Sequence, residues 1–157
     1  MKISTRGQYG VRAMTVLADR YGDGPIPSRD IAVAQGLSQS YLEQLLGPLR
    51  RAGLVRSVRG PEGGYYLARP PEKITVGDVL RVLEGSLSPV ECVEDHTDMC
   101  GREEICPARR VWVLVRDSVN RVVNSINLAD LLAPENLEMT EFDIFCDGDD
   151  VREATKN

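Results

Sequence analysis

Three cysteines, Cys92, Cys100 and Cys106, stand close together in one polar stretch of the 157-residue chain. In a reducing compartment, clustered thiols are more often metal ligands or redox sensors than structural disulfides. The C-x7-C-x5-C spacing lacks the close cysteine pairs of zinc fingers and ribbons. Such wide spacing suits an iron–sulfur cluster held in a loop. The sequence therefore predicts a cluster, and the alternative is a set of unliganded thiols that are neighbours in sequence only.

Three cysteines leave room for a fourth ligand. His96, the single histidine of the chain, lies between the first two cysteines and is the local candidate; a solvated loop histidine is the alternative. Pro107 is a favoured first helical residue, which predicts Cys106 at the helix N-cap, where the positive helix end would stabilise an anionic cluster. Cys146 is much further along the chain and is interpreted as a cysteine of the tail.

Three predicted helices precede this region. The first has an apolar face at helical spacing, formed by Gly10, Ala13, Met14, Leu17, Ala18 and Tyr21. The second is expected to begin at an N-cap, Ser28, and to end at Gly36, where a left-handed residue is favoured. The third follows a candidate N-cap, Ser38, and Pro48 is expected to bend or shorten its end.

Two β-prone runs, 54–58 and 64–67, flank the turn-forming residues 60–63 and predict a hairpin. A hairpin directly after a helix-turn-helix is a wing. The predicted fold is therefore mainly α with a small β wing: a winged helix-turn-helix over residues 1–73, followed by a long dimerisation helix. Between them, Thr75 and Asp78 form a capping-box pattern that opens a linking helix.

Heptad spacing appears after the cysteines, in Trp112, Val115, Val119, Val122 and Ile126. Such a stripe favours pairing with a second copy of the chain, and packing on its own domain is the alternative. Residues 74–132 are thus interpreted as linking helix, cysteine loop (91–106) and dimerisation helix. Residues 133–157 are interpreted as an acidic and partly mobile tail.

The net charge of −5 conceals an asymmetry between the two halves of the chain. Residues 1–73 have eleven Lys/Arg against six Asp/Glu, whereas residues 74–157 have eight against eighteen. A nucleic-acid partner is therefore plausible for the first half only. We find no signal-peptide pattern and no apolar run that could span a membrane, so a cytoplasmic protein is expected. No catalytic constellation or phosphate-binding loop is present in the sequence, which argues against an enzyme with a small-molecule substrate.

Several strings resemble those of a known family. They are MKISTRG at 1–7, SYLEQL at 40–45, AGLV at 52–55, VRGPEGGY at 58–65, GDV at 77–79 and LEG at 83–85. Together with the cysteine loop they make the chain similar, over roughly residues 1–132, to the bacterial winged-helix regulators IscR, NsrR, RirA and CymR. The resemblance implies a homodimeric regulator that binds double-stranded operator DNA according to the state of an iron–sulfur cluster.

The resemblance leaves the cluster type open. IscR-like members hold a 2Fe–2S cluster with three cysteines and a histidine three residues beyond the last one, and that position is Arg109 here. NsrR-like members complete a 4Fe–4S cluster with an aspartate near the N-terminus, where this chain has Gln8. The wider first gap is more similar to RirA, and CymR-like members use a partner enzyme in place of the cysteine trio. The alternatives are a cluster-free thiol-switch or partner-controlled repressor and, from another class, an electron-transfer iron–sulfur protein.

The start of the third helix is predicted to enter the major groove of DNA. Glutamine can pair with adenine, and the carboxylate of Glu43 can accept from cytosine N4, a role that the resemblance to IscR supports; a plain surface glutamate is the alternative. Arg59, beside the wing turn, suits a narrow minor groove. Other arginines are expected to contact phosphates. The complete predicted set is Ser38, Gln39, Ser40, Tyr41, Glu43, Gln44, Arg50, Arg51, Arg56 and Arg59.

Overall fold

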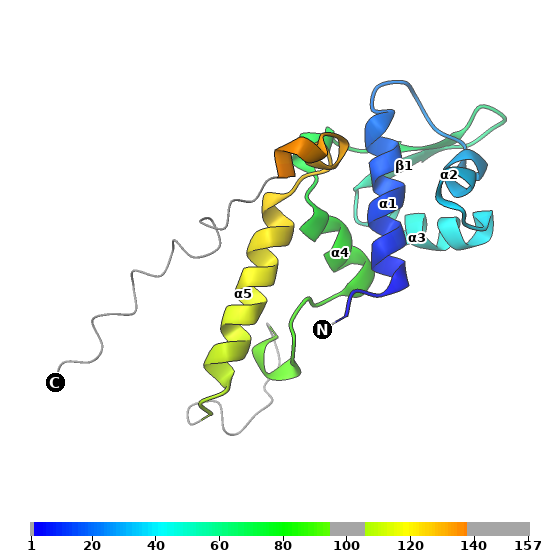
Figure 1. Cartoon of the computed structure of the whole chain (residues 1–157). Coiled ribbons are helices and arrows are strands. Elements are labelled where there is room, and N and C mark those ends of the chain that lie inside the picture. Colours follow the sequence, from blue (N-terminus) through cyan, green and yellow to red (C-terminus); the bar gives the residue numbers. More distant parts are fainter. Residues whose placement is uncertain (1, 95–105, 138–157) are drawn as a thin grey trace.

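A computed structural model describes residues 2–94 and 106–137. In this part of the chain, five α-helices and one two-stranded antiparallel sheet follow each other in the order expected of a winged helix-turn-helix protein with a long additional helix. Figure 1 shows α1 and α4 in the middle of the molecule, with α2 and α3 on one side and α5 on the other. The prediction of a mainly helical fold with a small wing is confirmed.

The first two helices differ from the prediction at their ends. Helix α1 spans Thr5–Asp19 and begins at an N-cap, Ser4, whose side chain accepts from the Gly7 N–H. Tyr21 lies beyond its end and is 48% exposed, so its assignment to the apolar face was wrong. Helix α2 spans Ser28–Gln35 and has Pro27, not Ser28, as its N-cap.

Helix α3, Gln39–Arg51, follows α2 after a short turn. Gly36 ends α2 with the left-handed φ of 65° that its type allows, and the Ser38 side chain caps α3 by accepting from the Tyr41 N–H at 3.2 Å. Both predictions are confirmed. Pro48 lies inside α3, and the helix continues beyond it to Arg51, so the expected shortening does not occur.

The wing consists of β1, Val55–Val58, and β2, Gly64–Leu67. The strands are antiparallel, with Val55 opposite Leu67 and Val58 opposite Gly64. Gly60 adopts a φ of 118° in the connecting turn, a conformation that favours glycine. Ile26, just before α2, pairs with Tyr65 through two backbone hydrogen bonds of 2.9 and 2.8 Å. This pairing fixes the segment before α2 against β2 of the wing.

Helix α4, Val76–Glu84, packs across α1. The predicted capping box is present: the Asp78 N–H donates to the Thr75 hydroxyl and the Thr75 N–H to the Asp78 carboxylate, each at 3.0 Å. The helices approach closely because α1 has a glycine at the crossing. A Cβ on Gly10 would collide with the Leu83 side chain.

Helix α5, Arg109–Ser125, is attached to the core at its carboxyl end. The Val76 N–H donates to the Ile126 carbonyl and the Leu128 N–H to the Ile74 carbonyl, both at 2.9 Å. Leu128 is fully buried. Ile126 is the C-cap of α5, so this last residue of the predicted heptad stripe lies just outside the helix.

Short 3-10 helices complete the described chain: η1 (Pro71–Lys73), η2 (Glu91–Val93), η3 (Asp130–Leu132) and η4 (Pro134–Leu137). One hydrophobic core joins α1, α2, α3, α4 and the strands, and Leu128 is included in it. Its buried residues are alanine, valine, leucine, isoleucine and one methionine. None of the described helices combines the length and the apolar character needed to cross a membrane.

Candidate nucleic-acid interface and cysteine site

The amino-terminal half of α3 presents polar side chains to solvent. Four leucines of this helix are buried in the core: Leu42, Leu45, Leu46 and Leu49. Because they occupy one face, the opposite face points outward. Of the six predicted base-reading residues, only Tyr41 is half-buried; the exposed ones are Ser38, Gln39, Ser40, Glu43 and Gln44. The structure therefore leaves the predicted recognition surface accessible.

Three of the polar side chains form a closed hydrogen-bonded group. One carboxylate oxygen of Glu43, Oε1, accepts from the Ser28 hydroxyl and from Gln39 Nε2, each at 3.1 Å. Gln39 Nε2 also donates to the Ser28 hydroxyl at 2.8 Å. The Ser28 hydroxyl thus bonds with side chains of α3, whereas the N-cap of its own helix is Pro27. We call these residues the Ser28–Gln39–Glu43 triangle.

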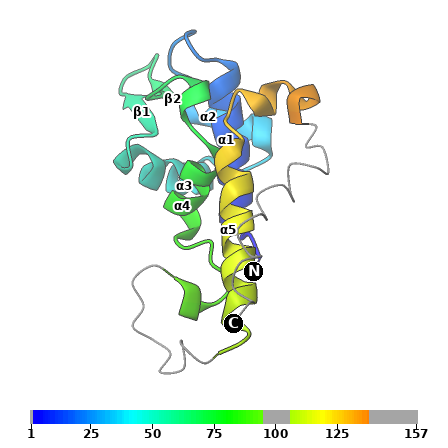
Figure 2. The same ribbon diagram turned by 90° about the vertical axis from the view of Figure 1, so that its left-hand side faces the viewer.

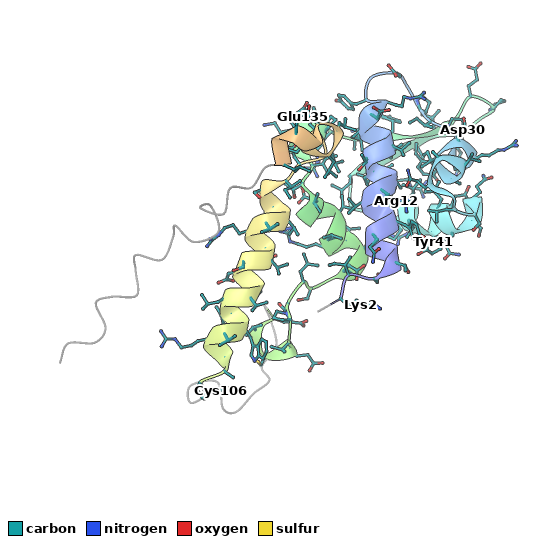
Figure 3. The ribbon with its side chains drawn as sticks, in the orientation of Figure 1. Lys2, Arg12, Asp30, Tyr41, Cys106 and Glu135 are labelled. Carbon is teal, nitrogen blue, oxygen red and sulfur yellow. The ribbon has the colours of Figure 1, made fainter. Side chains whose placement is uncertain are left out.

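Tyr41 is in contact with α1. Its ring lies edge-on to that of Tyr9, with centroids 6.3 Å apart and an interplanar angle of 87°. The guanidinium of Arg12 lies 5.1 Å from the centroid of the Tyr9 ring, and Arg12 Nε also donates to Gln35 Oε1 on α2 at 2.8 Å. Figure 3 shows Arg12 and Tyr41 at the adjoining edges of α1 and α3. The ring cluster thereby helps to set the orientation of α3 relative to α1.

A groove of about 410 Å³ separates α3 from the wing. Its lining includes Gln39 and Glu43 together with three arginines, Arg29, Arg50 and Arg59. Arg50 Nη1 bridges the groove by donating to the Ser57 hydroxyl on β1 at 3.1 Å. Arg29 was missed by the sequence analysis, although its place next to an expected helix start was a usable signal. The cationic lining suits an anionic partner such as a phosphate backbone.

The other predicted phosphate contacts do not line this groove. Arg56 lines a second hollow, of about 470 Å³, together with Arg50 and Arg69. Arg69 was also missed, because it follows the predicted hairpin. Arg51 is exposed on the last turn of α3. The arginines of this half therefore continue from the groove around the base of the wing.

The described cysteines lie on two separate elements. Cys92 is in η2 and Cys106 lies just before α5, and both are half-buried free thiols. η2 packs against α5, and Arg116 Nη1 on α5 donates to the Val93 carbonyl at 2.9 Å. Figure 2 shows η2 beside the amino-terminal end of α5. The two thiols therefore belong to the same end of the molecule.

Two predicted ligands, Cys100 and His96, lie outside the described residues, as does Cys146. Within residues 2–94 and 106–137, no group of three potential metal-binding side chains comes together. The predicted position of Cys106 was wrong: the N-cap is Ala108, and α5 begins at Arg109 rather than at Pro107.

Arg109 is the residue at the position where the resemblance places a histidine ligand. Its side chain is half-buried, and its Nε is buried without a hydrogen-bond partner in the described part of the chain. Its backbone N–H donates to the Cys106 carbonyl at 3.2 Å. Thiolates are the usual ligands of iron–sulfur clusters, and hydrogen bonds to their sulfurs tune them. Two thiols and an unsatisfied N–H at one end of the molecule therefore fit a cluster chemically.

Helix α5 exposes several large apolar side chains. None of its seventeen residues is buried. The exposed fraction is 53% for Val111, 37% for Trp112 and 67% for Leu114. Val115, Val119 and Val122 of the predicted stripe are half-buried. Val111 and Leu114 were missed because they lie beside the heptad positions. The exposed apolar surface of α5 is thus wider than the predicted stripe.

The two ends of the molecule are linked through α4 and α1. At the end of α4, Glu84 accepts from the Ser4 hydroxyl at 2.5 Å and from the Ser4 N–H at 3.4 Å. A Cβ on Gly7 would collide with the same carboxylate. In the same last turn of α4, Arg81 donates to Asn124 on α5. Helix α4 therefore contacts both the start of α1 and α5.

An exposed helix after a tight turn, followed by a wing with a cationic groove, defines a winged-helix DNA-binding protein of the transcription-regulator class. A family model described as Rrf2, iron-dependent transcriptional regulator, matches residues 3–134. The chain belongs to the Rrf2 family of transcription regulators.

Individual relatives agree with this assignment. The chain is 51% identical over 132 residues to the HTH-type transcriptional regulator CymR of Bacillus subtilis, covering 83% of this chain and 89% of CymR. The structure of CymR, titled the global cysteine regulator of B. subtilis, superposes with a TM-score of 0.72 at 47% identity, covering 85% of this chain and 98% of CymR. T. potens IscR superposes with a TM-score of 0.68 at 46% identity, covering 90% and 93%. These relatives are regulators of transcription, which supports a regulator in place of an enzyme.

Proposed function

We propose that this chain is a homodimeric regulator whose binding to a double-stranded DNA operator is controlled by an iron–sulfur cluster. Cys92, Cys100 and Cys106 are the proposed ligands, with His96 as candidate for the fourth. The observation that carries the proposal is that one fold contains both a surface suited to DNA and a pair of free thiols. The exposed face of α3 and the cationic groove lie on one side of α1, and two free thiols lie at the amino-terminal end of α5.

The DNA-reading role rests on α3 and the groove. The exposed start of α3 enters the major groove, where Glu43 accepts from cytosine N4 and Gln44 can pair with adenine. Ser38, Gln39, Ser40 and Tyr41 complete the recognition surface. Arg50, Arg51 and Arg56 bind phosphates, and Arg59 at the wing turn enters the minor groove. Each good base contact discriminates by about 1–3 kcal/mol.

The dimer rests on the apolar surface of α5. Large apolar side chains that form one exposed patch on a helix mark an interaction surface. We assign this surface to pairing with α5 of a second copy, through Trp112, Val115, Val119, Val122 and Ile126 and also through Val111 and Leu114. Two copies place two recognition helices at a fixed separation, which the half-sites of an operator must match.

The cysteines are connected through contacts within the chain to residues 1–73, which we call the DNA-reading half. A bound cluster supplies iron–thiolate bonds that tie its ligand residues to one another. Arg116 holds η2 to α5, the end of α5 pairs with the start of α4, and Glu84 holds α4 to the start of α1. A change in the position of η2 relative to α5 can therefore reach α1 and α3.

A second candidate is a regulator without a cluster, controlled by cysteine availability or by a partner protein. The observation that favours it is the 51% identity to B. subtilis CymR, whose structure is titled that of a global cysteine regulator. Such a regulator would use the same DNA-reading half. The two candidates differ only in whether the thiols bind iron.

The test is an anaerobic purification followed by visible spectroscopy and by measurement of iron and acid-labile sulfide per chain. About two of each would indicate a 2Fe–2S cluster, and about four a 4Fe–4S cluster. Cys106→Ala is expected to lose the metal and to change the affinity for an operator selected from random DNA. Cys146→Ala is the matched control and should change neither. A colourless wild-type protein free of iron that still binds its operator would contradict cluster control and favour the second candidate.

A further inference from the structure

The Ser28–Gln39–Glu43 triangle lies on the surface that is proposed to meet DNA, and it determines which polar groups remain available there. Glu43 Oε1 is occupied by two donors, whereas Oε2 has no partner among the described residues. The carboxylate is therefore held by one oxygen and presents the other one. An ionised carboxylate is an acceptor only.

Gln39 is restricted in the same way. A carboxylate cannot donate, so the Gln39 atom that faces Glu43 Oε1 has to be the amide nitrogen. That nitrogen donates to Glu43 at 3.1 Å and to Ser28 at 2.8 Å, so it is engaged within the triangle. Pairing with adenine in the bidentate mode needs a free N–H and the carbonyl oxygen together. In this arrangement Gln39 presents its carbonyl oxygen only.

Ser28 is the member of the triangle that the fold holds in place. It is the first residue of α2, two residues after Ile26, which is paired with Tyr65 of the wing. A Cβ on Gly64 would collide with the Ile26 carbonyl, so the backbones are in close contact here. A serine side chain has a single heavy-atom torsion, whereas Gln39 and Glu43 each have three. The hydroxyl of Ser28 is thus a fixed point that orders two longer side chains.

We infer that Ser28 is a specificity-determining positioning residue, which holds Gln39 and Glu43 so that both present acceptors alone to the major groove. This inference rests on the DNA-reading role proposed above. An acceptor-only surface selects base edges that carry an amino group, the N4 of cytosine or the N6 of adenine. It disfavours the N7 and O6 acceptors of guanine, because oxygen would face an acceptor without a hydrogen between them.

The experiment uses the full chain and a pool of DNA duplexes with a random central segment. Wild type first selects its preferred sequence, and Glu43→Ala then identifies the position that Glu43 reads. At that position we expect Ser28→Ala to weaken the preference for the selected base by roughly threefold to tenfold, the range of one hydrogen bond. Ser28→Thr keeps a hydroxyl and should keep the preference. In the Glu43→Ala background, Ser28→Ala should have no further effect there.

Ser86→Ala is the matched control, because this exposed serine follows α4 and is outside the groove. Its base preference should equal that of wild type, and thermal unfolding should show Ser28→Ala to be folded. An unchanged preference in Ser28→Ala, or an equal change with and without Glu43, would overturn the inference while leaving the proposed function intact. A wild-type chain that selects no sequence would overturn the proposed function and this inference with it.

Discussion

The DNA-reading half and α5 use the same kind of amphipathic helix but bury their apolar side chains in different places. In α3, four leucines are almost completely buried inside the same chain. In α5, no residue is buried, and Leu114 is 67% exposed. Since apolar burial is the main stabilising contribution to a fold, α3 is stabilised by the core of its own chain. Helix α5 gains most of its stabilisation only when something covers it.

This difference assigns separate roles to α3 and α5. The core under α3 fixes the positions of the side chains that are proposed to face DNA, so that they do not depend on a partner. In the proposed dimer, the exposed face of α5 would set the separation of two such units. A protein with this division can change which operator it prefers without altering its recognition helix.

The largest effect is expected from removing a core side chain, and it would sharpen the comparison. Leu46→Ala should lower the free energy of unfolding by about 2–5 kcal/mol, the usual cost of a buried leucine. Leu114→Ala is the matched change on α5 and should cost less than about 0.5 kcal/mol in dilute protein. Urea unfolding measures both. If the Leu114→Ala chain loses as much stability as Leu46→Ala at every protein concentration, then α5 is part of the monomer core and the comparison fails.

The next effect concerns the packing between α1 and α4, through which the two regions are joined. Gly10→Ala should destabilise the fold by about 1–3 kcal/mol, because the added Cβ meets Leu83. Gly47→Ala is the control within α3, where a Cβ would be 3.7 Å from the nearest atom. It should stabilise by roughly 0.5–1 kcal/mol, the helix preference for alanine. Thermal unfolding of the two variants should shift in opposite directions, and a parallel shift would argue against a tight α1–α4 contact.

A smaller and local effect is expected where η2 meets α5. Arg116→Ala removes the donor to the Val93 carbonyl. It should lower the free energy of local opening of residues 91–94 by about 0.5–1.5 kcal/mol. Hydrogen exchange of this segment reports the change, with Arg121→Ala, another arginine of α5, as control. Exchange in α1 and α3 should stay as in wild type. Equal exchange in both variants would mean that other contacts hold η2.

The smallest effect is expected from one phosphate contact. Arg50→Ala should reduce the salt dependence of operator binding, the slope of log K against log salt, by about 0.9, the value of one phosphate contact. Arg110→Ala changes an exposed arginine of α5 and should leave the slope unaltered. Binding titrations at several salt concentrations make the comparison. A change of slope in Arg110→Ala would place DNA on α5 as well and would end the separation of tasks.

Features that depend on nearby residues could be predicted from the sequence. The capping box at Thr75, the left-handed Gly36 and the hairpin were predicted because each is determined by a few neighbouring residues. The N-cap of α2 is Pro27, so the prediction of Ser28 as N-cap was wrong. The Ser28 hydroxyl has two partners on α3, eleven and fifteen residues away, and no local pattern reports them.

Contacts between distant segments explain what could not be predicted. The strings at 1–7 and 83–85 were recognised as family features, but their relation becomes visible only in the structure, where Ser4 and Glu84 are hydrogen-bonded across eighty positions. The apolar positions of α5 were predicted from their spacing, but Val111 and Leu114 were missed because exposure depends on where α4 lies. The cluster and all four of its proposed ligands, Cys92, Cys100, Cys106 and His96, remain predictions.

The anchoring of α5 at its carboxyl end has a mechanical consequence. A helix of seventeen residues is about 25 Å long, so a rotation of roughly 10° about the anchored end moves the other end by about 4 Å. This displacement exceeds the axial rise of one base pair, about 3.4 Å. In a dimer joined through α5, a small angular change at the junction with α4 would therefore shift the two copies of α3 by about one base pair along the duplex. Operators that differ by a single base pair in half-site spacing would then be distinguished by angle rather than by new contacts.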